Sequence, residues 1–204
     1  MDGYGCPQGS GPAVAAMLNL PNFLTLIRIL TIPFFLVYLS YHRYGEALII
    51  FIVGAVTDFL DGLAARLMHQ ETALGAYLDP IADKLLVITS FIMLGLIGGI
   101  PEWLAVTIVS RDILILLGYG IIHFLIDERL PVKPSTIGKW STMLQLLTLG
   151  VALALLHNEN FLDRRLWNTL IAVTTIATVV SGLQYLYRGL VWLQNKAPKI
   201  TGLG

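Results

Sequence analysis

Four aspartates lie within 26 consecutive residues of otherwise apolar sequence, at positions Asp58, Asp61, Asp79 and Asp83. An ionised side chain in hydrocarbon costs several kcal/mol, about 2.5–3.5 on insertion scales, so such groups need a compensating partner. Clustered carboxylates favour hard divalent cations, which prefer oxygen ligands. The four aspartates therefore predict a metal-binding site.

The spacing of the aspartates places each pair on one face of a helix. Asp58 and Asp61 are three residues apart, and Asp79 and Asp83 are four apart; residues at these separations are neighbours on a helix surface. Two facing pairs could hold two Mg²⁺ or Mn²⁺ ions, which can clamp a diphosphate and stabilise its attacking and leaving oxygens. A carboxylate at the rim of the metals could accept a proton from an incoming hydroxyl. Asp83, the deepest along its helix, is the candidate for this catalytic base.

Small residues and one arginine accompany the aspartates. Gly62, Ala65 and Gly75 remove bulk beside the predicted site, which leaves room for a flat base or a sugar. Small residues also allow close helix packing in membranes, which is the alternative interpretation. Arg66, about one turn beyond Asp61, suits a contact with phosphate.

The composition predicts an all-α membrane protein. The chain is 56% hydrophobic and 13% charged, with a mean hydropathy of +0.75, whereas a soluble domain carries about 25% charged residues. A membrane-spanning helix needs about 20 apolar residues. Six transmembrane helices are predicted, at 22–41, 46–67, 73–98, 102–126, 136–157 and 166–192. The formal net charge of zero provides no electrostatic footprint for nucleic acid.

Basic residues near the ends of these helices predict the orientation. If the N-terminus is cytoplasmic, the inner side carries the larger set, namely Arg66, Arg129, Lys133, Lys139, Arg188, Lys196 and Lys199. The outer side then carries Arg43, Arg164 and Arg165. We therefore expect an N-in, C-in protein of the cell (inner) membrane. The short loop between 46–67 and 73–98 predicts that these helices are antiparallel neighbours, with all four aspartates at one depth in the cytoplasmic half.

The chain is expected to hold one structural domain. Residues 1–19 are rich in Gly and Pro in their first part and predict a flexible leader. The six-helix membrane domain is expected at 20–195, and a C-terminal tail at 196–204.

The complete pattern Asp58-x2-Asp61-Gly62-x2-Ala65-Arg66-x8-Gly75-x3-Asp79-x3-Asp83 resembles the motif of the CDP-alcohol phosphatidyltransferase family at every fixed position. Residues 21–28, 110–112 and 133–139 also resemble family segments. The resemblance implies a six-helix membrane enzyme, usually a homodimer, that transfers a phosphatidyl group from CDP-diacylglycerol to an alcohol and releases CMP. It implies metal binding by the four aspartates, with Asp83 as base. It also implies a donor pocket that includes Gly62, Ala65, Arg66, Gly75 and Asn22.

Within this family the chain is most similar to the branch that makes phosphatidylglycerol phosphate and cardiolipin. The expected acceptor is glycerol 3-phosphate, and the alternative is phosphatidylglycerol, used by CMP-forming cardiolipin synthases. Where many members that use glycerol 3-phosphate carry a further arginine, this chain has Tyr119. A phosphorylated acceptor needs cationic groups, and Arg111, Lys139 and Arg188 are available. Lys139 and Arg188 could instead anchor helix ends at the interface.

An alternative from a different class is a membrane carrier for divalent cations, since acids inside a membrane also mark ion pathways. A carrier would place its site near the midplane, between inverted repeats. The four aspartates are predicted to lie toward one face of the membrane, and the sequence shows no symmetry between its halves. This pattern favours the enzyme.

Overall fold

The computed structural model describes the backbone of residues 20–68, 73–126 and 136–200, and within them the side chains of 27, 29–57, 84–118, 136–191 and 194. The described ranges contain helices and no strand, which confirms the predicted all-α fold. The helices are α1 (Leu20–Ser40), α2 (Tyr44–Met68), α3 (Ala73–Leu96), α4 (Glu102–Ile126), α5 (Thr136–His157) and α6 (Arg164–Ile200). The predicted leader, residues 1–19, lies outside the described residues.

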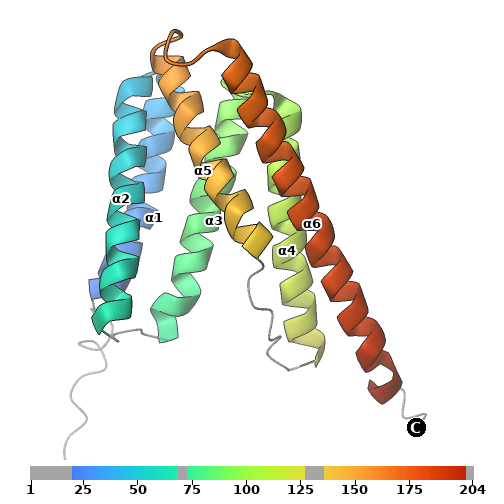
Figure 1. Ribbon diagram of the computed structural model, residues 1–204. Helices are drawn as coiled ribbons and strands as arrows, with labels where there is room; N and C mark the ends of the chain where they lie inside the picture. The colour runs from blue at the N-terminus through green and yellow to red at the C-terminus, as the bar shows by residue number, and fades with distance from the viewer. Residues whose placement is uncertain (1–19, 69–72, 127–135, 201–204) are drawn as a thin grey trace, which may run out of the picture.

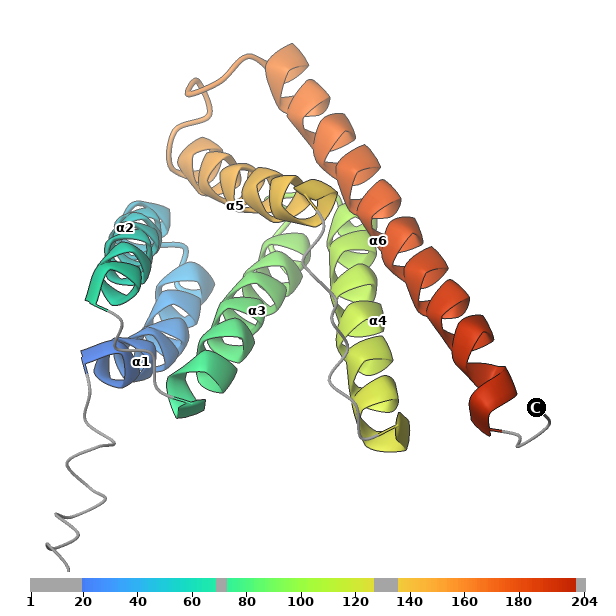
Figure 2. The same cartoon turned by 60° about the horizontal axis from the view of Figure 1, so that its bottom comes forward.

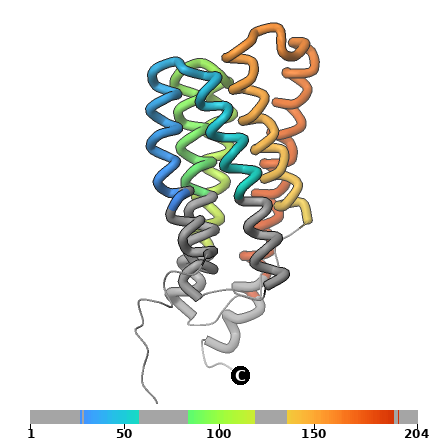
Figure 3. The backbone as a smooth tube through the Cα atoms, turned by 90° about the vertical axis from the view of Figure 1, so that its left-hand side faces the viewer, coloured from blue at the N-terminus to red at the C-terminus, as the bar shows by residue number. Residues whose placement is uncertain are grey.

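Successive helices run in alternating directions (Figure 1). The segments 41–43, 97–101 and 158–163 connect helices at one end of the bundle, here called the upper end. The start of α1 and the end of α6 both lie at the opposite, lower end. In the side view of Figure 3, the described helices run side by side toward the upper end.

The two helices that carry the aspartates are antiparallel, but they do not pack directly against each other within the described residues. Both α1 and α5 pack against α2 and against α3 instead, and Figure 2 shows α1 and α5 on either side of the line between them. Only four residues separate Met68 from Ala73, so these two ends lie within about 18 Å of each other. The expectation of direct neighbours was therefore wrong in the upper part, where α1 and α5 supply the contacts.

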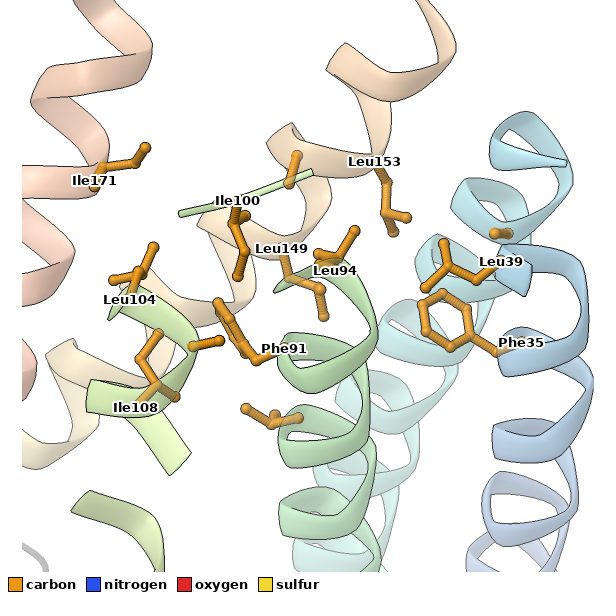
Figure 4. Close-up of a cluster of buried hydrophobic side chains, with 14 residues drawn as sticks. Phe35, Leu39, Phe91, Leu94, Ile100, Leu104, Ile108, Leu149, Leu153 and Ile171 are labelled. Carbon is orange, nitrogen blue, oxygen red and sulfur yellow. The ribbon is translucent and has the colours of Figure 1, made fainter. Parts of the chain in front are cut away.

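The hydrophobic core lies toward the upper end. Phe35 and Leu39 of α1 meet Phe91 and Leu94 of α3 there, and Leu153 of α5 packs with them (Figure 4). All five are at most 1% exposed. Lipid tails are as apolar as these side chains, so burial away from lipid provides little driving force. Close van der Waals packing supplies the attraction between such helices in a membrane. The core takes side chains from all six helices and joins them toward the upper end.

Left-handed residues end two helices at the upper end. His42 has φ of 60°, and the amide of Arg43 donates to the carbonyl of Tyr38 at 2.9 Å. Gly98, with φ of 76°, follows α3 in the same conformation. This motif satisfies carbonyls at a helix end and turns the chain sharply, so α1 and α2 need only three residues between them.

Two of the helices are long and apolar enough to cross a membrane within the described residues, at Thr136–His157 and Arg164–Val191. Shorter apolar helical stretches cover Ile29–Ser40, Tyr44–Thr57 and Lys84–Leu96. Large apolar side chains also lie exposed along the outward faces of the helices, as expected for a surface that contacts lipid rather than water.

Candidate functional site

The four aspartates occupy matching positions on two antiparallel helices. Asp58 lies ten residues before the end of α2, and Asp83 lies ten residues after the start of α3. At 1.5 Å per residue, both are about 15 Å from the joined ends of these helices. The backbone is helical at all four positions, so the three- and four-residue spacings do place each pair on one helix face.

The side chains of the motif lie outside the described residues. This holds for the four aspartates and for the predicted donor-binding residues Gly62, Ala65, Arg66, Gly75 and Asn22. Their backbones belong to α1, α2 and α3. Among the side chains that are described, no group of three or more His, Cys, Asp or Glu gathers in one place. The assignment of metal, donor and base therefore stays a prediction.

A buried ion cluster begins at the residue that follows the motif. Lys84 of α3 places its Nζ 2.8 Å from Oδ1 of Asp112 on α4. Arg111 donates from Nη1 to the same oxygen at 2.6 Å. Asp112 is fully buried, Arg111 is 6% exposed, and the Lys84 side chain is 25% exposed. We call these three residues the Lys84–Asp112–Arg111 cluster; it carries two positive charges and one negative charge.

Helix α6 provides the surface on which Arg111 lies. Nη2 of Arg111 donates to Oγ of Ser181 at 2.6 Å, and the guanidinium carbon is 5.8 Å from the centre of the Tyr185 ring. A Cβ atom on Gly182 would lie 3.3 Å from Cγ of Arg111, so the glycine leaves room for the arginine stem. The Nε of Arg111 has no partner among the described residues.

A row of buried hydroxyl and amide groups continues along the contact between α5 and α6. Gln145 donates to Oγ1 of Thr178 at 3.1 Å, and Ser141 also bonds Thr178, at 3.4 Å. Thr148 and Thr174 share a hydrogen bond of 2.8 Å. Polar groups between helices in a membrane find partners on the neighbouring helix. This row fixes α5 against α6, and through Ser181 it extends to Arg111.

The other two candidate acceptor residues lie on exposed surfaces. Lys139 is in the first turn of α5, and Arg188 lies seven residues beyond Ser181 on α6. Seven residues are about 10 Å of helix, which puts Arg188 on the lower side of the Arg111 contact. The structure thus buries one of the three predicted cations and leaves two exposed.

From the sequence, Asp112 was noted only within residues 110–112, a segment that resembles the family. Its place at the centre of an ion cluster was not predicted. A signal was present, because Lys84, Arg111 and Asp112 are charges within predicted membrane spans. Such charges pair with one another, so Asp112, an acid in the interior of the predicted α4 span, could have been assigned to both cations. Ser181 and Gly182 carried no comparable signal.

The comparison with known proteins agrees with the motif. Residues 18–182 match the CDP-alcohol phosphatidyltransferase family. A probable phosphatidylglycerophosphate synthase of Mycobacterium tuberculosis is 32% identical over 182 residues, which cover 86% of this chain and 84% of that protein. The CDP-diacylglycerol–glycerol-3-phosphate 3-phosphatidyltransferase of Aquifex aeolicus is 36% identical, over 84% of this chain and 96% of that protein.

A putative cardiolipin synthase of Mycobacterium tuberculosis is 39% identical over 128 residues, or 62% of this chain and 60% of that protein. The chain therefore belongs to the CDP-alcohol phosphatidyltransferase family, which confirms the resemblance drawn from the motif. The family and the apolar helices together identify a membrane protein. The cation-carrier alternative finds no support in these relatives.

Proposed function

We propose that this protein transfers the phosphatidyl group of CDP-diacylglycerol to glycerol 3-phosphate, giving phosphatidylglycerol phosphate and CMP. The observation that carries the proposal is the complete aspartate motif at one depth of α2 and α3, in a chain of this family. The names of relatives that align over most of their length support the choice of glycerol 3-phosphate.

The metal site is proposed to hold two Mg²⁺ or Mn²⁺ ions on Asp58, Asp61, Asp79 and Asp83. An all-carboxylate donor set fits hard cations, and the family is generally dependent on divalent metals. When bound, such ions supply neutralisation of the diphosphate charge. The donor nucleotide is proposed to lie against Gly62, Ala65, Arg66, Gly75 and Asn22.

The chemical step needs one base and one acceptor hydroxyl. Asp83 accepts the hydroxyl proton as the acceptor oxygen forms a bond to the phosphorus of the phosphatidyl group. The bond from that phosphorus to the bridging oxygen of the diphosphate breaks, and CMP leaves with the electron pair. A positioned base of this kind contributes about 10²–10⁴ to a rate.

The acceptor phosphate is proposed to bind Arg111, with Lys139 and Arg188 assisting. A guanidinium has five N–H donors, and the contacts to Asp112 and Ser181 occupy two of them. Phosphatidylglycerol is the second candidate acceptor. The 39% identical putative cardiolipin synthase and Tyr119 in place of a further arginine favour it.

We further propose six membrane spans in an N-in, C-in arrangement, a site open to the cytoplasm, location in the inner membrane, and a homodimer. The start of α1 and the end of α6 lie at the same end of the bundle, which supports an even number of membrane crossings. The excess of basic residues toward that end supports its cytoplasmic side.

The test is a product assay on purified protein with CDP-diacylglycerol and Mn²⁺, offered glycerol 3-phosphate or phosphatidylglycerol in separate reactions. We expect phosphatidylglycerol phosphate and an equal amount of CMP in the first reaction, and no CMP in excess chelator. Cardiolipin in the second reaction alone would establish the alternative acceptor. Full CMP release in chelator would contradict the metal site.

A further inference from the structure

We infer that Asp112 is a positioning residue for the acceptor: it touches no substrate, but it orients Arg111 and fixes α4 beside the catalytic aspartate of α3. The inference rests on the proposed function, in which Arg111 binds the acceptor phosphate. It begins from one observation: Oδ1 of the fully buried Asp112 contacts two cationic side chains, Lys84 of α3 and Arg111 of α4.

The first part of the argument concerns the direction of the Arg111 donors. Asp112 holds Nη1 and Ser181 holds Nη2, and these two contacts come from different helices. Because the guanidinium is planar and rigid, fixing two of its nitrogens fixes the direction of every N–H group. The donors that remain, Nε among them, are therefore held in one orientation before any acceptor arrives.

The second part concerns the position of α4. Lys84 is the residue after Asp83, and its ammonium group lies 2.8 Å from the same Asp112 oxygen. The ion pair therefore ties α4 to α3 next to the proposed base. Arg111 and Asp83 consequently sit on two helices that are joined at neighbouring residues, which holds the phosphate site and the base at a constant separation.

The third part concerns what a purely structural role would do. Removing one partner of a buried ion pair leaves the other charge uncompensated and destabilises the fold. A loss of folded protein lowers the amount of active enzyme and leaves each KM unchanged. A loss of Arg111 orientation instead weakens binding of the acceptor and spares the donor, so the two roles differ in the KM values.

The experiment measures steady-state kinetics with both substrates varied, for Asp112→Asn, Asp112→Glu, Arg111→Ala and the double variant Arg111→Ala/Asp112→Asn. We expect Asp112→Asn to raise the KM for the acceptor by about tenfold or more and to change the KM for CDP-diacylglycerol by less than about twofold. Asp112→Glu, which keeps the charge, should recover part of the loss. In the Arg111→Ala background, Asp112→Asn should add no further increase, because the two act as one unit.

The matched control is Thr148→Val, which removes a buried hydrogen bond between α5 and α6 away from the cluster. It should leave both KM values unchanged. Ser181→Ala removes the second contact on the guanidinium and keeps every charge, so it tests the same idea if Asp112→Asn fails to fold. We expect it to raise the acceptor KM as well.

Two results would overturn the inference. One is a lower kcat for Asp112→Asn with both KM values unchanged. The other is a full-sized effect of Asp112→Asn when Arg111 is already alanine. Failure of the proposed function is separate, because it appears in the wild-type protein as no product from glycerol 3-phosphate. If the wild type uses phosphatidylglycerol instead, the same kinetics with that acceptor decide the role of Asp112; if it uses neither, both proposals fall.

Discussion

At the scale of single residues, two ion pairs in this protein have different consequences. Arg43 and Glu46 pair on the surface, with side chains 61% and 41% exposed, and water and salt screen such pairs so that they add little to stability. The Lys84–Asp112–Arg111 cluster is buried, and removing one partner of a buried pair costs about 3–5 kcal/mol. Substitutions in the buried cluster should therefore lower the stability of the fold more than substitutions in the surface pair.

The proposed base gives a prediction at the same scale. Asp83→Asn keeps the size of the side chain and removes its ability to accept a proton, so CMP release should fall by about 10²–10⁴. The measurement is CMP formation by purified protein that elutes at the wild-type position on size-exclusion chromatography. Glu159→Gln, an exposed acid in the upper connection, is the control and should be fully active. Normal turnover by the Asp83 variant would remove the base assignment.

Gly182, which lies against the Arg111 side chain, gives another prediction. Gly182→Ala puts a Cβ atom 3.3 Å from Cγ of Arg111, so the arginine must shift by a few tenths of an ångström. We expect the KM for the acceptor to rise by about three- to fivefold, since small misplacements of a binding group reduce its effect. Gly189→Ala is a matched control on the same helix, because nothing lies within 4 Å of its Cβ position. Equal KM values for the two variants would contradict this account of Gly182.

At the scale of elements, the connections at the upper end depend on backbone conformation. Gly98 ends the turn after α3 with φ of 76°, a region that costs other residues about 1–2 kcal/mol. The row of hydrogen bonds between α5 and α6 contributes less for each bond, about 0.6 kcal/mol in membrane proteins. Replacing Gly98 by a residue with a Cβ should therefore cost more than losing one hydrogen bond of this row.

Gly98→Ala should lower the unfolding free energy by about 1 kcal/mol. Nothing lies within 4 Å of the added Cβ, so backbone strain is the cause. The measurement is the thermal unfolding midpoint in detergent. Gly54→Ala is the control with the opposite sign: Gly54 also has open space around its Cβ position but lies inside α2, where alanine stabilises by about 0.5–1 kcal/mol. A rise in the midpoint for both variants would show that Gly98 is not needed for its φ angle.

At the scale of the whole molecule, the apolar core and the aspartate motif lie toward opposite ends of the bundle. The closely packed apolar core, drawn in Figure 4, is built from residues in the upper parts of the helices. The aspartate motif lies in the lower parts of α2 and α3. The core thereby holds together the helices whose middle and lower parts are proposed to bind substrate.

The proposed orientation makes a prediction about the whole molecule, tested with Cys6→Ser as background. Asn160→Cys lies in the exposed connection at the upper end, and Gln194→Cys is exposed near the lower end of α6. A maleimide that cannot cross membranes should label the first variant in intact cells and the second only after permeabilisation, because of the basic residues at the lower end. The reverse pattern would contradict the N-in, C-in arrangement.

The helices and the chemical character of the motif were predictable from the sequence. Apolar run length and residue spacing are local properties, so the predicted spans agree with the helices to within a few residues in most cases. The exception is α6, predicted at 166–192 but helical from Arg164 to Ile200. Hydropathy identifies the apolar stretch of this helix, but it cannot show that the helix continues through the more polar residues beyond 192.

The sequence by itself determined that the helices are apolar and that four aspartates share two helix faces, because both follow from neighbours along the chain. Only the tertiary structure decided that Asp112 joins Lys84 to Arg111 and that Ser181, 70 residues away, holds the guanidinium. It also decided that α1 and α5, rather than a direct contact, bridge the upper parts of α2 and α3. These contacts depend on how each helix is rotated and packed against partners remote in sequence, and residue spacing along one helix does not fix that rotation.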